Sequence, residues 1–152
     1  MQLSTNFWLS EFTASETAEA QGIDNTPNYT EKLKLALLCQ DILQPARDNF
    51  GQLNVTSGFR GKALNKAVGG ADDSQHRLAE AGDVIPEYVS CKELTQWIRD
   101  NTDFDQVIWE KRSDGVEWVH VSYKPLRENR GEVLTAIVDS GGNARYFKGV
   151  VQ

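Results

Sequence analysis

The stretch that says most about the fold is residues 106–123, which read QVIWEKRSDGVEWVHVSY. Two runs rich in β-branched and aromatic residues, 106–111 and 116–123, flank the turn-forming residues 113–115. Such side chains favour strands, and a short turn between two such runs joins them as an antiparallel pair. The stretch therefore predicts a β-hairpin that carries His120 on its second strand.

On either side of this hairpin, hydrophobic periodicity and turn chemistry predict the remaining elements. A capping box at residues 13–16 opens a short helix that ends near Gly22, and Thr30 caps the longest helix. Pro45 predicts a kink in that helix, which resumes to Gly51. The other predictions are a helix at 91–99 capped by Ser90, a helical turn at 63–65, strands at 53–56 and 83–85, and a second hairpin of 132–139 and 144–150.

Helical and hairpin segments occupy separate parts of the chain, which predicts an α+β fold rather than a doubly wound α/β fold. The sequence contains no internal repeat, low-complexity tract or linker, and 152 residues suffice for one core. We therefore expect a single domain over residues 1–152. Its sheet should be small and antiparallel, built from hairpins, with helices packed against it.

Composition excludes several classes of protein. Acidic residues outnumber basic ones by 22 to 16, giving a net charge of -6, which argues against nucleic-acid binding. No apolar run approaches the length of a membrane-spanning helix, and the N-terminal residues lack the charged start and apolar core that we would expect of a signal peptide. Two cysteines are too few for a disulfide-rich secreted scaffold. We expect a monomer that is made in the cytoplasm and needs another route to any site of action outside it.

The only histidines are His76 and His120, so a metal site made of histidines alone is impossible. Asp83 follows His76 by seven residues, and small residues between them allow a tight fold. Two histidines, one carboxylate and an open fourth position match a catalytic zinc site, with Glu117 three residues before His120 as a candidate general base. The alternative is that both histidines are ordinary core or surface residues and Asp83 caps a turn.

Several separated motifs resemble one known family. They are VTSGFR at 55–60, LNKAVGGA at 64–71, SQH at 74–76, Asp83, and WVH at 118–120. Together they are similar to the D-alanyl-D-alanine carboxypeptidase family of zinc peptidases, most closely to its phage-type peptidase domain, which includes cell-wall endolysins. The resemblance covers about residues 6–127 and leaves the C-terminal hairpin at 132–150 outside it.

The resemblance implies a zinc ion on His76, Asp83 and His120, at the sheet. It further implies that Arg60 grips an anionic group of the substrate and that Ser74 lies beside the metal. A guanidinium suits the first task because its fork of N–H donors matches a carboxylate.

Two glutamates are candidates for the general base that the resemblance implies. Glu117 has the Glu-x-x-His spacing of several branches, whereas the phage-type branch commonly has a glutamate at the position of Glu110. The sequence favours Glu117 slightly, although strand alternation would place it on the face opposite His120. The chain also departs from the family in having Ala79 where glycine is usual and Gly82 where alanine is usual.

The function implied is zinc-dependent hydrolysis of an amide bond in peptidoglycan stem peptides, by a D,D-carboxypeptidase or an L,D- or D,D-endopeptidase. The enzyme would act on the cell wall or in the periplasm, released by lysis or carried by a phage particle. The main alternative is a non-catalytic module that binds peptidoglycan in a phage tail or cell-wall complex. A non-haem iron oxygenase is disfavoured because Leu78 stands where its carboxylate ligand would be, and a globular domain without metal remains a third alternative.

Overall fold

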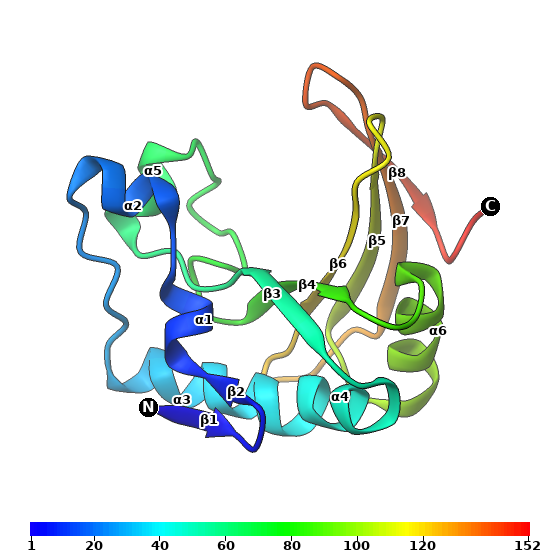
Figure 1. The fold of residues 1–152 in the computed structure, drawn as a ribbon, viewed down its shortest axis with the longest axis horizontal. Coiled ribbons are helices and arrows are strands. Elements are labelled where there is room, and N and C mark those ends of the chain that lie inside the picture. Colours follow the sequence, from blue (N-terminus) through cyan, green and yellow to red (C-terminus); the bar gives the residue numbers. More distant parts are fainter.

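A computed structural model describes residues 1–152, and its central feature is a six-stranded sheet (Figure 1). In spatial order the strands are β3 (Leu53–Ser57), β4 (Ala81–Pro86), β6 (Glu117–Ser122), β5 (Gln106–Arg112), β7 (Glu132–Val138) and β8 (Ala144–Lys148). The predicted hairpins are present as the antiparallel pairs β5–β6 and β7–β8. The α+β fold class is therefore confirmed.

The sheet is mixed, which corrects the expectation of a purely antiparallel one. β7 pairs with β5 in parallel, with Gln106 opposite Glu132 and Arg112 opposite Val138. After β6 the chain passes through residues 123–131 and crosses to the other side of β5. The two hairpins are thus joined along two strands that run in the same direction, a pairing that hairpin signals alone do not predict.

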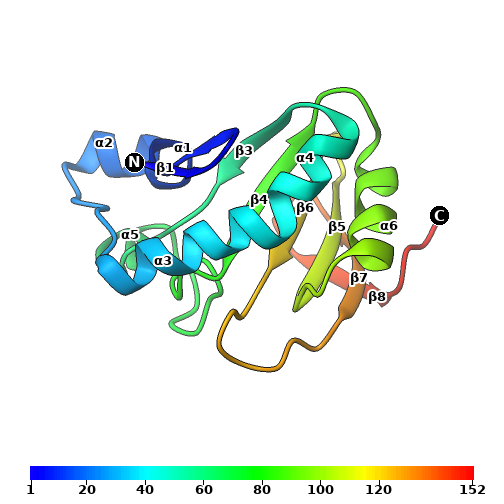
Figure 2. The same cartoon turned by 90° about the horizontal axis from the view of Figure 1, so that it is seen from below.

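One long helical run crosses one face of the sheet (Figure 2). It consists of α3 (Tyr29–Leu38), a π-helical turn η1 (Cys39–Leu43) and α4 (Gln44–Phe50). The regular helix is interrupted near Pro45 by this π-helical turn, which lies just before it, and Pro45 itself occupies the first turn of α4. The cap of this run is Asn28, whose side chain accepts from the Glu31 amide, and not Thr30.

The remaining elements comprise five short ones and one longer helix that packs against β5 and β6 on the helix-covered face of the sheet. They are β1 (Gln2–Ser4), β2 (Phe7–Trp8), α1 (Leu9–Thr13), α2 (Glu16–Gln21), α5 (Lys62–Ala67) and α6 (Cys91–Asn101). Ser15 caps α2 and Gly22 ends it in the left-handed conformation, while Ser90 caps α6 as expected. No helix is long and apolar enough to cross a membrane.

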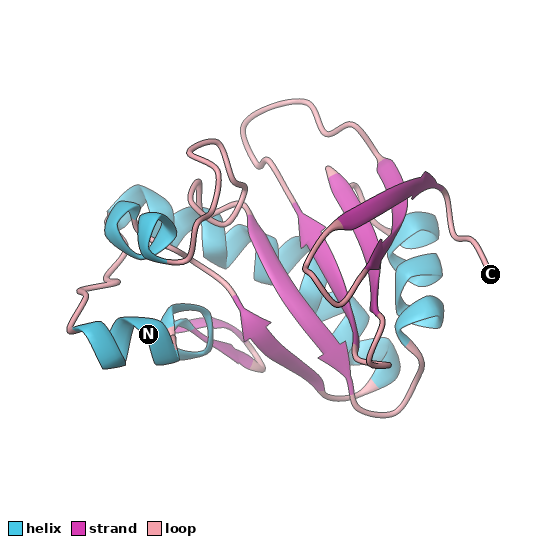
Figure 3. Ribbon diagram, turned by 90° about the horizontal axis from the view of Figure 1, so that it is seen from above, coloured by secondary structure: helices cyan, strands magenta, loops and turns pink.

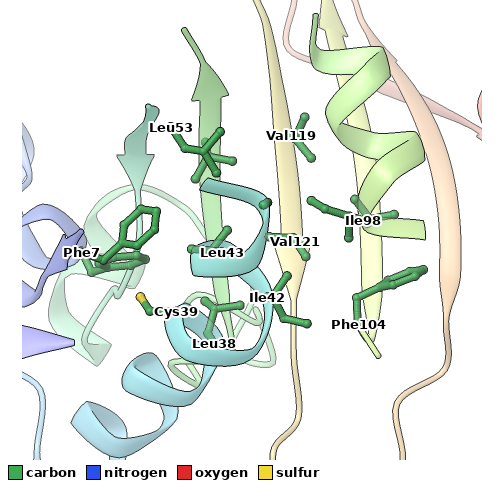
Figure 4. Close-up of a cluster of buried hydrophobic side chains, with 14 of the residues drawn as sticks. Phe7, Leu38, Cys39, Ile42, Leu43, Leu53, Ile98, Phe104, Val119 and Val121 are labelled. Carbon is green, nitrogen blue, oxygen red and sulfur yellow. The ribbon is translucent and has the colours of Figure 1, made fainter. Parts of the chain in front are cut away.

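The hydrophobic core lies between the sheet and the helices α3, α4 and α6 (Figure 4). Val119 and Val121 of β6 point into it and meet Ile42 and Ile98 from the helical side. Because side chains alternate along a strand, Trp118, His120 and Ser122 project from the opposite face. That face is free of helices (Figure 3), and it carries the polar site described next.

Candidate metal centre

His76 lies in the connection between α5 and β4, with only 6% of its surface exposed. Its Nδ1 is 2.7 Å from the carbonyl oxygen of Gly58. A carbonyl only accepts, so Nδ1 carries the proton and donates it, and the lone pair lies on Nε2. The ring is therefore oriented with Nε2 available as a ligand atom.

The segment from His76 to Asp83 folds back on itself tightly. The amides of Ala79 and Glu80 donate to the carbonyls of His76 and Gln75. Ala79 has φ of 59°, the left-handed region that glycine adopts without strain and alanine adopts at a cost of about 1 kcal/mol. Residue 79 therefore has a backbone conformation that favours glycine, the residue that the resemblance gives as usual at this position.

Asp83 and His120 are brought together by direct pairing of β4 with β6, in which they are opposite residues. Oδ1 of Asp83 lies 3.0 Å from Nδ1 of His120 and 3.3 Å from Nε2 of His76. One ligand atom from each of these residues lies within 4.8 Å of the others. The register of β4 with β6 and the tight turn from His76 to Asp83 together bring the three predicted ligands to one point.

The charges at this point are strongly coupled. Burial raises the pKa of Asp83, but the two facing imidazoles outweigh it and hold the pKa well below its ordinary value. Burial lowers the pKa of His76, and the Asp83 carboxylate more than offsets this, so the net shift is upward. The site therefore favours an ionised carboxylate between two imidazole nitrogens.

The donor set fits a zinc ion. Two imidazole nitrogens and one carboxylate oxygen are the protein ligands of many catalytic zinc sites, which keep one further position open. Here the three ligand atoms face a cleft on the helix-free side of the sheet. The cleft is lined by Arg60, Asp73, Ser74, Gln75, His76, Asp83, Gln106, Ile108, Glu110, Trp118, His120 and Tyr146.

Arg60 and Ser74, the two residues that the resemblance implies at the substrate and beside the metal, both line this cleft. The Arg60 guanidinium donates to the Ser74 hydroxyl over 3.2 Å, and the Arg60 amide donates to the His76 carbonyl. Burial lowers the pKa of Arg60, and the nearby Asp83 partly offsets this. The buried Nε of Arg60 has no hydrogen-bond partner within the protein.

The two candidate bases lie on opposite faces of the sheet. Glu110 of β5 is opposite Trp118 of β6, on the same face as His120, and lines the cleft. Burial and the Asp83 charge raise the pKa of Glu110. Glu117 instead accepts a hydrogen bond from the indole Nε1 of Trp109, a core residue on the helix-covered side. The structure therefore brings Glu110 to the ligand cluster and leaves Glu117 away from it.

Gln75 and Tyr146 line the cleft without having been singled out from the sequence. Gln75 adjoins His76, and that adjacency was the only available signal. Tyr146 reaches the cleft because β8 extends the sheet and places it opposite Ala136, which in turn pairs with Glu110. No sequence signal gives that placement, since it depends on the parallel pairing of β5 with β7.

An α+β domain with two imidazoles and a carboxylate converging at an open cleft has the protein ligands of a catalytic-type metal site. Residues 5–122, more than half of the chain, match the family described as Peptidase M15. The chain therefore belongs to the M15 peptidases, a family of D-alanyl-D-alanine carboxypeptidase-like zinc metallopeptidases, and the resemblance seen in the sequence is confirmed. No curated protein matches the chain.

Proposed function

We propose that this protein is a zinc-dependent peptidase that hydrolyses an amide bond in peptidoglycan stem peptides, as a D,D-carboxypeptidase or an endopeptidase. The observation that carries the proposal is the convergence of His76, Asp83 and His120 within 4.8 Å at a cleft. Arg60 and Glu110 reach the same cleft and supply the other two groups that such a reaction needs.

Zinc would be held by Nε2 of His76, Nδ1 of His120 and a carboxylate oxygen of Asp83. When bound, it would supply a water with a pKa lowered to about 7 and a Lewis acid for the scissile carbonyl. The protein's own contribution is to hold three ligands rigidly on a strand pair and a hydrogen-bonded turn, so that little reorganisation accompanies the reaction.

Arg60 would bind a carboxylate of the stem peptide. Its side chain is half-buried, it is held by Ser74, and its Nε has no partner inside the protein. A guanidinium with free donors in a partly desolvated site binds a carboxylate more strongly than a solvated lysine does. Its role is to place the substrate, which contributes to the rate through orientation.

Glu110 would act as the general base, taking a proton from water and passing it to the leaving amine. Burial and the charge of Asp83 raise its pKa, which makes its carboxylate a better proton acceptor at neutral pH. Glu117, slightly favoured by its spacing from His120, has its carboxylate engaged by Trp109 on the other face. We therefore prefer Glu110.

The site of action would be the cell wall, reached by lysis or on a phage particle. The net charge of -6 gives no electrostatic attraction to an anionic wall. Delivery would thus depend on a partner or on a high local concentration, and the protein would work as a monomer.

Digestion of purified muropeptides, with products identified by mass spectrometry, tests the proposal. The zinc-loaded protein should release either a terminal D-alanine or two peptide fragments, and a chelator should abolish the products. A protein that holds one zinc ion per chain but leaves every muropeptide uncut would instead be a binding module.

A further inference from the structure

Gln75 bridges the candidate metal centre to a buried charge network. Its Oε1 lies 2.8 Å from Nε2 of His120, and its Nε2 lies 3.1 Å from Oδ2 of Asp105. The side chain is half-buried at the edge of the cleft. It therefore connects His120 to a carboxylate that is not itself part of the cluster of ligands.

Asp105 is fully buried, and its carboxylate accepts hydrogen bonds from several surrounding donors. Arg130 donates to it through its backbone amide, Nε and a terminal nitrogen, Ser122 donates its hydroxyl, and the ammonium group of Lys124 lies 3.5 Å away. Burial raises the pKa of Asp105, but the hydrogen bonds and charge of Arg130 more than offset this and hold it at about 2. Asp105 is therefore ionised at neutral pH and can only accept hydrogen bonds.

The orientation of the Gln75 amide follows from this. Because Asp105 only accepts, Gln75 must present its NH₂ group to Asp105 and its oxygen to His120. An amide oxygen also only accepts, so Nε2 of His120 must carry a proton. With a metal ion between Nδ1 and Asp83, the ring is neutral and its lone pair lies on Nδ1, the nitrogen that faces Asp83.

We propose that Gln75, held by Asp105, is a positioning residue that selects the tautomer of His120 and directs its Nδ1 toward the metal. His76 is oriented in the same way by a group that only accepts, the carbonyl of Gly58. Acceptors of this kind behind metal-binding histidines fix the ring and strengthen the ligand. Arg130 lies outside residues 5–122, so the C-terminal part of the chain supports the site through Asp105.

This inference rests on the proposed metal site, and the affinity for zinc tests it directly. Gln75→Met keeps the size of the side chain and removes both hydrogen bonds. We expect it to weaken zinc binding by about 10- to 100-fold, measured by competition with a chromophoric chelator. It should also shift the visible spectrum of the cobalt-substituted protein. Gln52→Met, the same replacement at an exposed residue far from the cleft, should leave both quantities unchanged.

A double exchange separates positioning from general loss of structure. Gln75→Glu sets two carboxylates against each other, and Asp105→Asn sets an NH₂ group against the NH₂ group of Gln75, so each alone should weaken zinc binding. When the two changes are combined, the new carboxylate at position 75 accepts a hydrogen bond from His120. The new amide at position 105 donates its NH₂ group to that same carboxylate. The double variant should therefore bind zinc more tightly than either single variant.

Measurement on the unaltered chain avoids any question of folding. In the cadmium-substituted protein with ¹⁵N-labelled histidine, coupling to the metal should appear at Nδ1 of His120, with a proton on Nε2. Coupling at Nε2 of His120 would overturn the inference, as would wild-type zinc affinity in Gln75→Met or a double variant no better than its parents. A wild-type protein that binds no zinc would instead contradict the proposed function.

Discussion

The carbonyl oxygen of Gly58 lies 2.7 Å from Nδ1 of His76, so the backbone just after β3 orients a ligand of the candidate metal centre. Gly58 can occupy this position because it has no side chain. A Cβ atom there would lie 2.6 Å from both Cα and the carbonyl oxygen of Phe12, which are backbone atoms of α1. Close packing of α1 against Gly58 and the orientation of His76 are therefore coupled.

Gly58→Ala should weaken both the fold and the metal site. The added methyl group forces the backbone apart, and overpacking of this kind costs about 1–3 kcal/mol of unfolding free energy. The same displacement moves the carbonyl that His76 donates to, so zinc affinity should fall as well. Urea unfolding and chelator competition measure the two effects. Gly61→Ala is the matched control, since its Cβ would make only an ordinary contact of 3.4 Å; equal effects at both positions would contradict the coupling.

Glu110→Gln should lower turnover of muropeptides by about 10²- to 10⁴-fold, because it removes the proposed base while keeping its shape. The zinc content should stay the same, since Glu110 is not among the three residues proposed to hold the metal. Glu117→Gln is the internal control and should keep near-normal turnover, because glutamine still accepts from Trp109. Loss of turnover in Glu117→Gln alone, with zinc retained, would reverse the assignment of the base.

Arg60→Ala should reduce kcat/KM by about 10- to 100-fold for a substrate with a free carboxylate. This factor corresponds to the free energy of one hydrogen bond to a charged group. For the same peptide carrying a C-terminal amide, the loss should be much smaller, because the lost partner is the carboxylate. Steady-state kinetics with both peptides gives the comparison. An equal loss on both would mean that Arg60 supports the site only through Ser74 and the backbone of His76.

Asp105 should make the metal-free fold sensitive to acid. Its pKa in the folded protein is about 2, against 3.8 for a free aspartate, because Arg130 outweighs the effect of burial. A carboxyl group whose pKa is lower in the folded than in the unfolded chain stabilises the fold at pH values above its unfolded-state pKa. That stabilisation is lost as the pH falls through the folded-state pKa. Asp105→Asn should cost about 2 kcal/mol of unfolding free energy at neutral pH, and the difference should vanish between about pH 4 and pH 2. A difference that stays constant over that range would contradict this role.

The sequence predicts those parts of the molecule whose signals are local. Turn chemistry at 113–115 predicts the hairpin of β5 and β6, Ser90 predicts the start of α6, and the spacing of His76, Asp83 and His120 suggests the ligand set. The parallel pairing of β5 with β7 depends on how residues 123–131 cross the sheet, and no pattern within either strand encodes it.

The candidate metal centre likewise has some features that the sequence indicates locally and others that depend on tertiary packing. Strand alternation already indicated that Glu117 would face away from His120, and the pairing of Glu110 with Trp118 places Glu110 beside the cluster. The link from Gln75 to Asp105 spans 30 residues, and Arg130 approaches Asp105 from a further 25 residues along the chain. Contacts across such separations follow from tertiary packing, so they are visible only in the folded chain.

Titration of the metal-free protein with zinc, while muropeptide cleavage is measured, tests the central claim most directly. Cleavage should be absent without metal, rise in proportion to added zinc, and level off at one zinc ion per chain. His76→Ala, titrated alongside, should show no cleavage at any zinc concentration in that range. Cleavage that persists in excess chelator, or that His76→Ala retains at wild-type level, would contradict a peptidase built on His76, Asp83 and His120.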